Sequence, residues 1–279
     1  LASGLRAHLP LLQVGATHRL QVRRAAGRRV DVHLSAPLTD DELGPYRQTQ
    51  AQQAYAAVTE PLDEGLVYFQ SYTGAWATDS PLAICEELQR RRPDLDLVWG
   101  VADRSAWHPE GTRAVLWRSR EWYDVLARAG HVVTNIEMEP WFRRRDGQEV
   151  VQSFHGYPSK TMGEVLWRAK NFTDSRVAQQ LERTSGNWSV LLTPSPAMDV
   201  HYREQYRYEG RIVSEGYPRD DLLAGERAEQ VRKETRERLG IGEGTTAVLY
   251  APTWRDDQAT NFRAAKFSTD LDLAAAARA

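Results

Sequence analysis

Short apolar runs alternate with amphipathic stretches through the middle of the chain, and this pattern predicts an α/β fold. Three runs rich in β-branched and aromatic residues are typical of strands, at residues 66–70, 95–99 and 131–135. Helix-start signals precede two intervening stretches, so we expect helices at residues 80–92 and 119–129, the second stopped by Gly130. Because strands and helices alternate, we expect a parallel sheet with helices on its faces.

The alternation continues toward the carboxyl end with shorter elements. We expect further strands at residues 149–153, 188–192 and 211–213. Between and after them we expect helices at residues 175–185, 196–206 and 227–239. An apolar run at residues 247–250 predicts the first strand of a second α/β domain.

The first sixty or so residues follow a different pattern. Segments 18–22 and 30–34 alternate apolar and polar residues around a turn at Gly27, which predicts a β-hairpin. The polar, glutamine-rich stretch that follows is interpreted as a connector with a short helix at residues 47–57. We therefore divide the chain into a hairpin region with its connector, an α/β domain and the start of a second α/β domain, at residues 1–62, 63–240 and 241–279.

The composition narrows the class of protein. The chain has 279 residues, of which 41% are hydrophobic, enough for at least one sizeable core. It contains no apolar run long enough to cross a bilayer and no signal-peptide pattern, so we expect a soluble or membrane-surface protein. The single Cys85 excludes an intrachain disulfide and fits a reducing cytoplasm. We predict no metal site, because three histidines lack partners at metal-ligand spacing: His108, His131 and His201.

The net charge of −2 hides four local clusters of arginine. They lie at residues 23–24, 28–29, 90–92 and 143–145. Such clusters are either solvated faces or sites of attraction to an anionic membrane or a polyanionic substrate, and the sequence leaves both interpretations open. The tryptophans near them belong either to a headgroup interface or to the protein core: Trp117, Trp122, Trp141 and Trp167. We expect no nucleic-acid partner.

The most informative motif is FHGYPSK at residues 154–160, directly after a predicted strand. Open α/β sheets bind ligands beyond the carboxyl ends of their strands, so this loop is a candidate site. His155 can exchange a proton near neutral pH, and Gly156 lets a substrate approach the backbone. Lys160 supplies a positive charge for a phosphate oxygen. The loop therefore combines acid-base chemistry with anion binding.

Two later motifs indicate phosphate binding less directly. GYPRDD at residues 216–221 predicts a turn and a capped helix, and it also places Arg219 where a guanidinium can pair with a phosphate. LYAPTWRD at residues 249–256 presents Thr253 and Arg255 just past a predicted strand. That position suits nucleotide contact, and a surface ion pair between Arg255 and the next residue is the alternative.

The remaining features are weaker. A turn at residues 74–81 either attracts an anion to a helix N-terminus or simply caps that helix. No Walker loop, Gly-x-Ser-x-Gly elbow or Gly-x-Gly-x-x-Gly fingerprint occurs. The chain therefore lacks the commonest nucleotide-binding motifs, but this does not exclude nucleotide binding by other residues.

Taken in this order, the motifs resemble those of the CDP-glycerol glycerophosphotransferase family, whose enzymes build the poly(glycerol phosphate) or poly(ribitol phosphate) chains of teichoic acids. The resemblance extends from about residue 66 to residue 256. It begins with an opening strand and glycine loop at residues 68–74, followed by Asp-Ser-Pro at residues 79–81. The three motifs described above complete it.

The resemblance implies a GT-B-like architecture, with a complete amino-terminal parallel-sheet domain and the start of a nucleotide-binding domain. The implied reaction is attack by a hydroxyl of a lipid-linked acceptor on the β-phosphate of CDP-glycerol or CDP-ribitol, which releases CMP. His155 matches the family's general base. The other motif residues become candidates to bind substrate or phosphate: Gly156, Lys160, Arg219, Thr253 and Arg255. The resemblance also implies a cytoplasmic protein, peripheral on the inner face of the cell membrane and without a covalently bound cofactor; its metal requirement and oligomeric state stay open.

The same resemblance indicates a fragment, because the family's second histidine and Asp-Tyr-Ser-Ser segment would follow the last residue given. We therefore expect little transfer by these 279 residues alone. Two other functions stay open from the sequence: a GT-B glycosyltransferase that uses a nucleotide sugar, and a non-catalytic membrane-surface or polymer-binding module. Release of CMP from CDP-glycerol, compared with release of UDP from sugar donors, separates the two enzymes.

Overall fold

The computed structural model describes most of the chain and divides it into two units. The described residues are 8–27, 29–158, 160–251, 272 and 275. The two units are Leu1–Gly225 and Glu226–Ala279. All strands of the described residues belong to the first unit. The domain limits predicted at residues 62 and 240 stay predictions.

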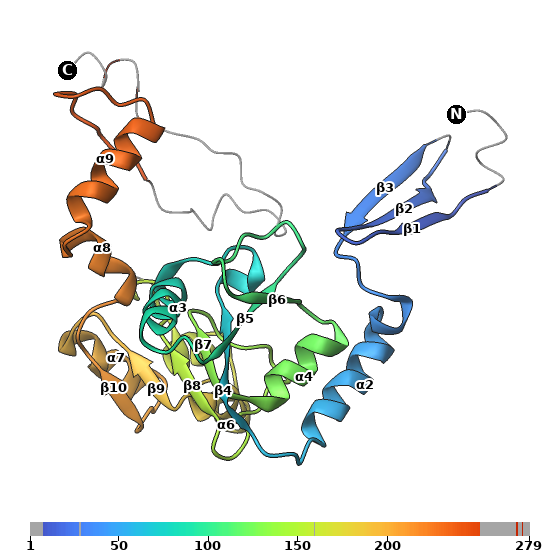
Figure 1. Ribbon diagram of the computed structural model, residues 1–279. Coiled ribbons are helices and arrows are strands. Elements are labelled where there is room, and N and C mark those ends of the chain that lie inside the picture. The colour runs from blue at the N-terminus through green and yellow to red at the C-terminus, as the bar shows by residue number, and fades with distance from the viewer. Residues whose placement is uncertain (1–7, 28, 159, 252–271, 273–274, 276–279) are drawn as a thin grey trace. The chain divides into compact units, whose positions relative to one another are not determined.

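A seven-stranded parallel sheet forms the centre of the first unit, in the order β10-β9-β8-β7-β4-β5-β6 (Figure 1). This confirms the predicted parallel α/β fold. The strands have these bounds: β4 Asp63–Gln70, β5 Asp96–Val101, β6 Arg113–Leu116, β7 Ala129–Thr134, β8 Glu149–Gln152, β9 Val190–Leu192 and β10 Arg211–Val213.

The strand order reverses beside β4, and this reversal fixes where a ligand can bind. The chain proceeds outward from β4 through β5 to β6, then returns to the other side of β4 as β7 and proceeds outward again to β10. The loops after β4 and β7 therefore leave their strands in opposite directions. Such a switch point opens a crevice beyond the carboxyl ends of the strands, where doubly wound sheets bind their ligands.

Helices cover both faces of the sheet because the side chains of β4 alternate between them. Leu66 and Tyr68 pack against α4 (Arg120–Arg128) and α2 (Pro45–Ala56) in one buried cluster. The intervening β4 side chains pack with Cys85 of α3 (Asp79–Arg91) in a second cluster on the other face. Figure 1 shows α3 and α4 on opposite sides of β4.

A third buried cluster is mostly aromatic and supports the strands beyond β8. It joins Phe154, Trp188 and Tyr202 with the neighbouring helices. Those helices are α5 Gly163–Ala169, α6 Asp174–Arg183 and α7 Pro196–Gln205. After β10 the chain forms two more helices, α8 Asp221–Ala224 and α9 Ala228–Arg238.

Most predicted elements are confirmed within a few residues, and the differences have physical causes. Gly130 lies inside β7 rather than stopping α4, which ends at Arg128. The sequence pattern does not predict β6 and α5, which are only four and seven residues long. The strand predicted at residues 247–250 is wrong, because these residues are described without strand structure and Val248 and Leu249 are exposed. An apolar run forms a strand only when a partner strand completes its hydrogen bonds.

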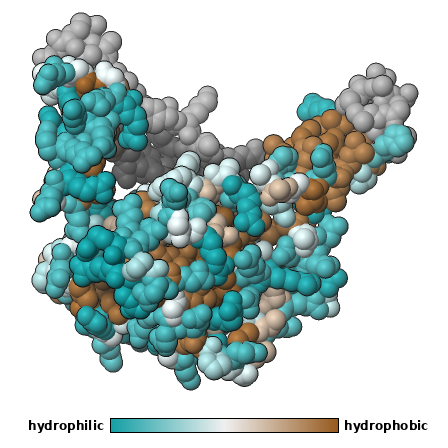
Figure 2. Space-filling model, in the orientation of Figure 1, coloured by the Kyte–Doolittle hydropathy of each residue, from teal (hydrophilic) through white to brown (hydrophobic). Residues whose placement is uncertain are grey.

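The predicted hairpin is part of a three-stranded antiparallel sheet. Its strands are β1 Leu11–Val14, β2 Arg19–Arg24 and β3 Val30–Ser35, and β1 was not predicted. Several apolar side chains on it are exposed, among them Leu11, Val32 and Leu34, and Figure 2 shows this apolar surface in brown.

The tryptophans named in the sequence analysis belong to the core. Trp122 and Trp167 are buried, while Trp117 and Trp141 are partly buried against the first cluster. The interpretation of these four as headgroup contacts is therefore wrong. The most exposed tryptophans among the described residues are Trp76 and Trp107.

Two of the arginine clusters have structural partners. In the cluster at residues 143–145, Arg145 donates hydrogen bonds to the carbonyls of Glu60 and Ala127. In the cluster at residues 90–92, the first two arginines pair with Glu87. None of the described helices is long and apolar enough to cross a membrane.

The buried hydroxyl of Tyr68 generates a stability prediction. It donates to Gln70 Oε1 at 2.7 Å and accepts from Trp122 Nε1 at 2.7 Å, and a Cβ at Gly100 would overlap it. Tyr68→Phe leaves two buried polar groups without partners, so it should lower the free energy of unfolding by about 1–3 kcal/mol. Urea unfolding measures this loss. Tyr46→Phe, at an exposed tyrosine, is the control and should change stability by less than about 0.5 kcal/mol.

Candidate active site

The loop after β4 takes an unusual backbone path. Tyr72 and Thr73 have φ values of 43° and 58°, in the left-handed region that non-glycine residues rarely adopt. Gly74 follows with φ 79°, and its carbonyl accepts from Ala102 N at 2.8 Å. A Cβ at Gly74 would lie only 2.8 Å from that same nitrogen, so only glycine allows this contact with the end of β5. The glycine thereby fixes where Tyr72 leaves the sheet.

The loop after β8 is anchored by a buried aromatic ring. Phe154 has φ 47° and packs at 5.1 Å from Tyr202 and 5.3 Å from Trp188, between ring centroids. The preceding Ser153 donates its backbone N–H to Thr134 O, at the end of β7. The loop is therefore bound both to the aromatic cluster and to the neighbouring strand, and His155 emerges from a fixed point.

His155 is exposed and has one defined hydrogen-bond partner. Its Nδ1 lies 2.9 Å from Asn135 O, the backbone carbonyl of the first residue after β7. Because a carbonyl only accepts, Nδ1 carries the hydrogen in this contact, and neutral His155 then has its lone pair on Nε2. The ring of Tyr72 packs edge-on at 5.6 Å. This arrangement presents Nε2 as a proton acceptor.

Arg219 reaches His155 from the turn after β10. Tyr217 anchors this turn, because it is buried and its hydroxyl donates to Met198 Sδ. The ring of Tyr217 lies 4.7 Å from the guanidinium carbon of Arg219. Arg219 Nη1 donates to His155 O at 2.9 Å. The structure thus brings together two residues that the sequence places in separate motifs.

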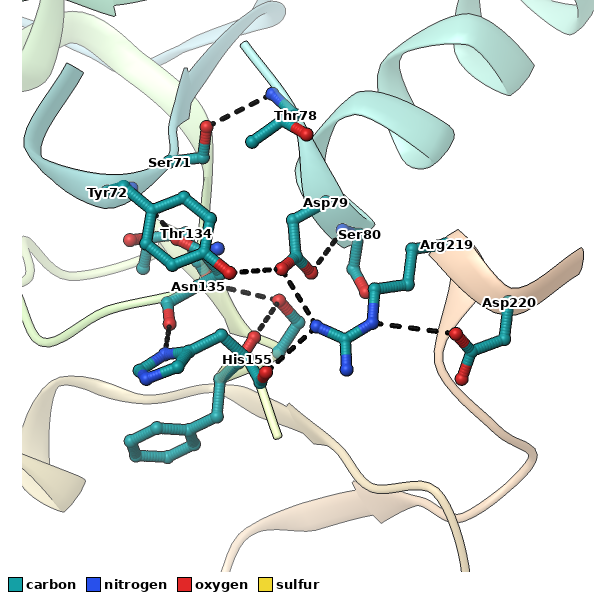
Figure 3. A network of polar contacts seen from close by, with 12 residues as sticks. Ser71, Tyr72, Thr78, Asp79, Ser80, Thr134, Asn135, His155, Arg219 and Asp220 are labelled. Carbon is teal, nitrogen blue, oxygen red and sulfur yellow. Dashed lines mark hydrogen bonds and ion pairs between the residues drawn. The ribbon is translucent and has the colours of Figure 1, made fainter. Parts of the chain in front are cut away.

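Asp79 completes the site and was not predicted as a site residue. Its carboxylate accepts from Tyr72 Oη at 2.5 Å, from Ser80 N at 2.6 Å and from Arg219 Nη1 at 2.8 Å (Figure 3). The Asp79 side chain is only 5% exposed. The turn at residues 74–81 was interpreted as an anion site or a cap, and the structure shows that a carboxylate of the chain itself occupies it.

Burial and hydrogen bonding act in opposite directions on Asp79. Burial disfavours the charged carboxylate, but the hydrogen bonds from Tyr72, Ser80 N and Arg219, together with the charge of Arg219, outweigh it and lower the pKa of Asp79. Burial, and then the hydrogen bond to Asp79, raise the pKa of Tyr72 to about 12. The tyrosine is therefore a neutral donor, and the carboxylate an ionised acceptor, at neutral pH.

The remaining predicted site residues lie in the loop of His155 or in the segment after residue 251. Around Gly156 there is open space, with no atom within 4 Å of where a Cβ would lie. Lys160 is exposed in the same loop, and its role as a phosphate-binding cation stays a prediction. Thr253 and Arg255 lie outside the described residues. In the part of the chain that the structure describes, no group of acidic, histidine or cysteine side chains has the geometry of a metal site.

Sequence reasoning missed three residues that build the site: Tyr72, Asp79 and Asn135. Partial signals existed, since Asn135 ends a predicted strand and Asp79 precedes a predicted helix. Left-handed backbone is the structural signal, because Tyr72, Thr73, Asp79 and Phe154 make up four of the seven non-glycine residues with positive φ among the described residues. Such strain concentrates at functional sites, but no sequence rule identifies it at these residue types.

The fold and the site together define a doubly wound α/β domain of the GT-B type, with a histidine, an arginine and a buried carboxylate at its switch point. The sequence pattern of the CDP-Glycerol:Poly(glycerophosphate) glycerophosphotransferase family matches residues 53–279. The chain belongs to this family.

Known relatives agree with this assignment. The chain is 27% identical over 219 residues to the teichoic acid poly(glycerol phosphate) polymerase of Bacillus subtilis, covering 76% of this chain and 29% of that protein. It is also 27% identical over 219 residues to the teichoic acid glycerol-phosphate transferase of Staphylococcus aureus, covering 76% and 56%. A solved variant of the wall teichoic acid polymerase TagF has 25% identity and a TM-score of 0.69, over 77% of this chain and 54% of that one. The matched part of the chain thus spans between about a third and a little over half of the length of these relatives.

The ionisation of Asp79 gives a pH-dependent prediction for stability. Because its folded-state pKa lies below the unfolded value of about 3.9, its contribution is complete above that value and is lost as the pH falls through the folded-state pKa. Asp79→Asn should lower the free energy of unfolding by about 1–3 kcal/mol at pH 7. This difference from the wild type should shrink below about pH 4, as measured by urea unfolding at several pH values. A difference that stays constant down to pH 3 would contradict an ionised Asp79.

Proposed function

We propose that the protein is a glycerophosphotransferase that moves glycerol phosphate from CDP-glycerol to a hydroxyl of a lipid-linked, teichoic-acid-type acceptor and releases CMP. The observation that carries the proposal is the geometry of His155. In a chain of this family, its Nδ1 is tied to Asn135 O and its Nε2 is presented at the switch point of the sheet.

The reaction follows from this geometry. An acceptor hydroxyl oxygen attacks the β-phosphorus of the donor, and His155 Nε2 takes the hydroxyl proton as the new P–O bond forms. The bond between that phosphorus and the oxygen bridging to CMP breaks, and CMP leaves with the bonding electrons. Phosphoryl transfer of this kind depends mainly on positioning and on stabilising charge at the phosphate oxygens.

Cationic side chains would supply that stabilisation. Arg219 has Nη1 engaged by Asp79 and His155, and its guanidinium carries further donors that can reach a phosphate oxygen. We assign Lys160 to the same task, and we assign Thr253 and Arg255 to contact with the nucleotide of the donor, Thr253 through its neutral hydroxyl. CDP-ribitol is the alternative donor. An assay with a chelator shows whether transfer needs a divalent metal.

The proposed acceptor also suggests where the protein acts. We place it in the cytoplasm, peripheral on the inner face of the membrane, where a lipid-linked acceptor is accessible. Two exposed tryptophans support this position. Trp76 belongs to the segment between Tyr72 and Asp79, and the backbone of this segment contacts that of Trp107, because Ala77 N donates to Trp107 O at 3.4 Å. Tryptophan is enriched at membrane interfaces.

Replacing the base tests the proposed function directly. In the full gene product, His155→Gln should reduce CMP release from CDP-glycerol, in the presence of acceptor, by about 10²- to 10⁴-fold, because no group remains to take the hydroxyl proton. Circular dichroism should show an unchanged fold. His33→Gln, at an exposed histidine of β3, is the control and should retain full activity. Assays with CDP-ribitol, with UDP-sugars and with a chelator identify the donor and any metal requirement. Near-normal turnover of His155→Gln would remove His155 from the mechanism.

The open space at Gly156 gives a second prediction. Gly156→Ala meets no atom within 4 Å, so it should change the free energy of unfolding by less than about 0.5 kcal/mol. Transfer should nevertheless fall by about tenfold, because the added methyl group occupies space beside His155 that the reacting groups need in order to align. Gly186→Ala, at a glycine between α6 and β9 that also tolerates a Cβ, is the matched control. Equal activity of both variants would place the substrates elsewhere.

A further inference from the structure

Asp79 has more partners than helix capping requires. At the start of α3, where Thr78 is the N-cap residue, the carboxylate of Asp79 accepts one backbone hydrogen bond, from Ser80 N. The same carboxylate also accepts from the hydroxyl of Tyr72, seven residues earlier, and from Arg219, 140 residues later. Moreover, Asp79 adopts φ 65°, a backbone conformation that costs an aspartate some stability. A carboxylate held in this way has a role beyond starting a helix.

The partners of Asp79 form a closed ring of contacts around His155. Tyr72 donates its backbone N–H to Asn135 Oδ1 at 3.1 Å, and Asn135 O accepts from His155 Nδ1. His155 O in turn accepts from Arg219 Nη1, which also donates to Asp79. Figure 3 shows these contacts converging from separate loops. The ring joins the segments that follow β4, β7, β8 and β10 to the first residue of α3.

Within this ring, Asp79 is the only acidic side chain that draws two of the loops together. Tyr72 packs its ring against the His155 imidazole, and Arg219 donates a hydrogen bond to the His155 carbonyl. Both are bound to one carboxylate that is nearly inaccessible, with 5% of its side chain exposed. Because so little of it is exposed, Asp79 acts through these neighbours rather than on a substrate.

We propose that Asp79 is a positioning residue, whose carboxylate fixes Tyr72 and Arg219 against the His155 loop and so sets the location of Nε2. This role rests on the proposed function, in which Nε2 takes the proton of the acceptor hydroxyl. Without the negative charge, Arg219 loses its ion pair with Asp79 and keeps the one with Asp220, in its own turn, so the carbonyl of His155 loses a fixed donor. The base is then present but displaced from the attacking oxygen.

Kinetics of the full gene product test the proposal. Asp79→Asn keeps one acceptor oxygen, which can serve Ser80 N or Tyr72 Oη but not both, and it removes the charge that faces Arg219. It should lower kcat for CMP release by about 10- to 100-fold, the effect of misplacing a catalytic group by about 1 Å, and change KM for CDP-glycerol by less than about threefold. Tyr72→Phe, which removes one hydroxyl, should lower kcat by about three- to tenfold. The double variant should lose clearly less than the product of the two single losses, because both act through one contact.

A carboxylate that pairs with an arginine elsewhere provides the matched control. Asp96 accepts from Arg113 Nε at 3.0 Å and from Arg113 Nη2 at 2.9 Å. It is the first residue of β5, so it lies at the amino ends of the parallel strands, whereas the site lies beyond their carboxyl ends. Asp96→Asn should leave kcat within about twofold of the wild type. A similar kcat loss in Asp96→Asn and Asp79→Asn would mean a general structural effect and would overturn the positioning role.

A second measurement does not depend on activity. With histidine labelled at Cε1, the NMR signal of His155, assigned with His155→Gln, should shift in Asp79→Asn and in Tyr72→Phe but not in Asp96→Asn. If the wild type releases no CMP from CDP-glycerol, the proposed function fails, and this signal still decides whether Asp79 positions His155. If transfer occurs but Asp79→Asn leaves kcat and the signal unchanged, only the positioning role is overturned. Should Asp79→Asn fail to fold, Tyr72→Phe decides by the same two criteria.

Discussion

The parallel pairing of β4 with β7 is the interaction on which the site depends. Their ends pair in register, with Gln70 opposite Thr134, so the loops that follow start level with each other. This alignment lets Tyr72 N reach Asn135 Oδ1, and the adjoining pairing of β7 with β8, with Thr134 opposite Gln152, brings Ser153 N to Thr134 O. A register shift of one residue would turn alternate side chains to the other face of the sheet and separate these contacts. The position of His155 is therefore a consequence of how three neighbouring strands, β4, β7 and β8, align.

Stability and strain are distributed unevenly around this alignment. The left-handed residues at the site each cost about 1–3 kcal/mol, and surrounding packing must compensate for them. Phe154 shows how, since its strained backbone directs a ring into the aromatic cluster, where burial contributes about 1.5–3 kcal/mol. On the other side of the site, Gly74 presses the β4 loop against the end of β5. The strained segment is thus supported by rigid structure on both sides.

The sequence allowed the prediction of what depends on local pattern. Apolar runs separated by capped helices indicated the parallel sheet, and motif order indicated His155 and Arg219. The links between the motifs were not predictable, because Asp79 contacts a residue 140 positions away and its carboxylate looks the same in the sequence as a cap. The failure at residues 247–250 has the same origin, since an apolar run does not indicate whether a partner strand exists. Periodicity likewise did not show which way Trp117 and Trp141 face.

The contact between Gly100 and Tyr68 limits which substitutions this chain can accept. A side chain at position 100 would overlap the Tyr68 hydroxyl, and that hydroxyl is held by Gln70 and Trp122. Neither position can acquire a larger residue while the other stays as it is. Substitutions there should therefore appear as compensating pairs in related sequences, and the small group of residues in the centre of the sheet should evolve as a single unit.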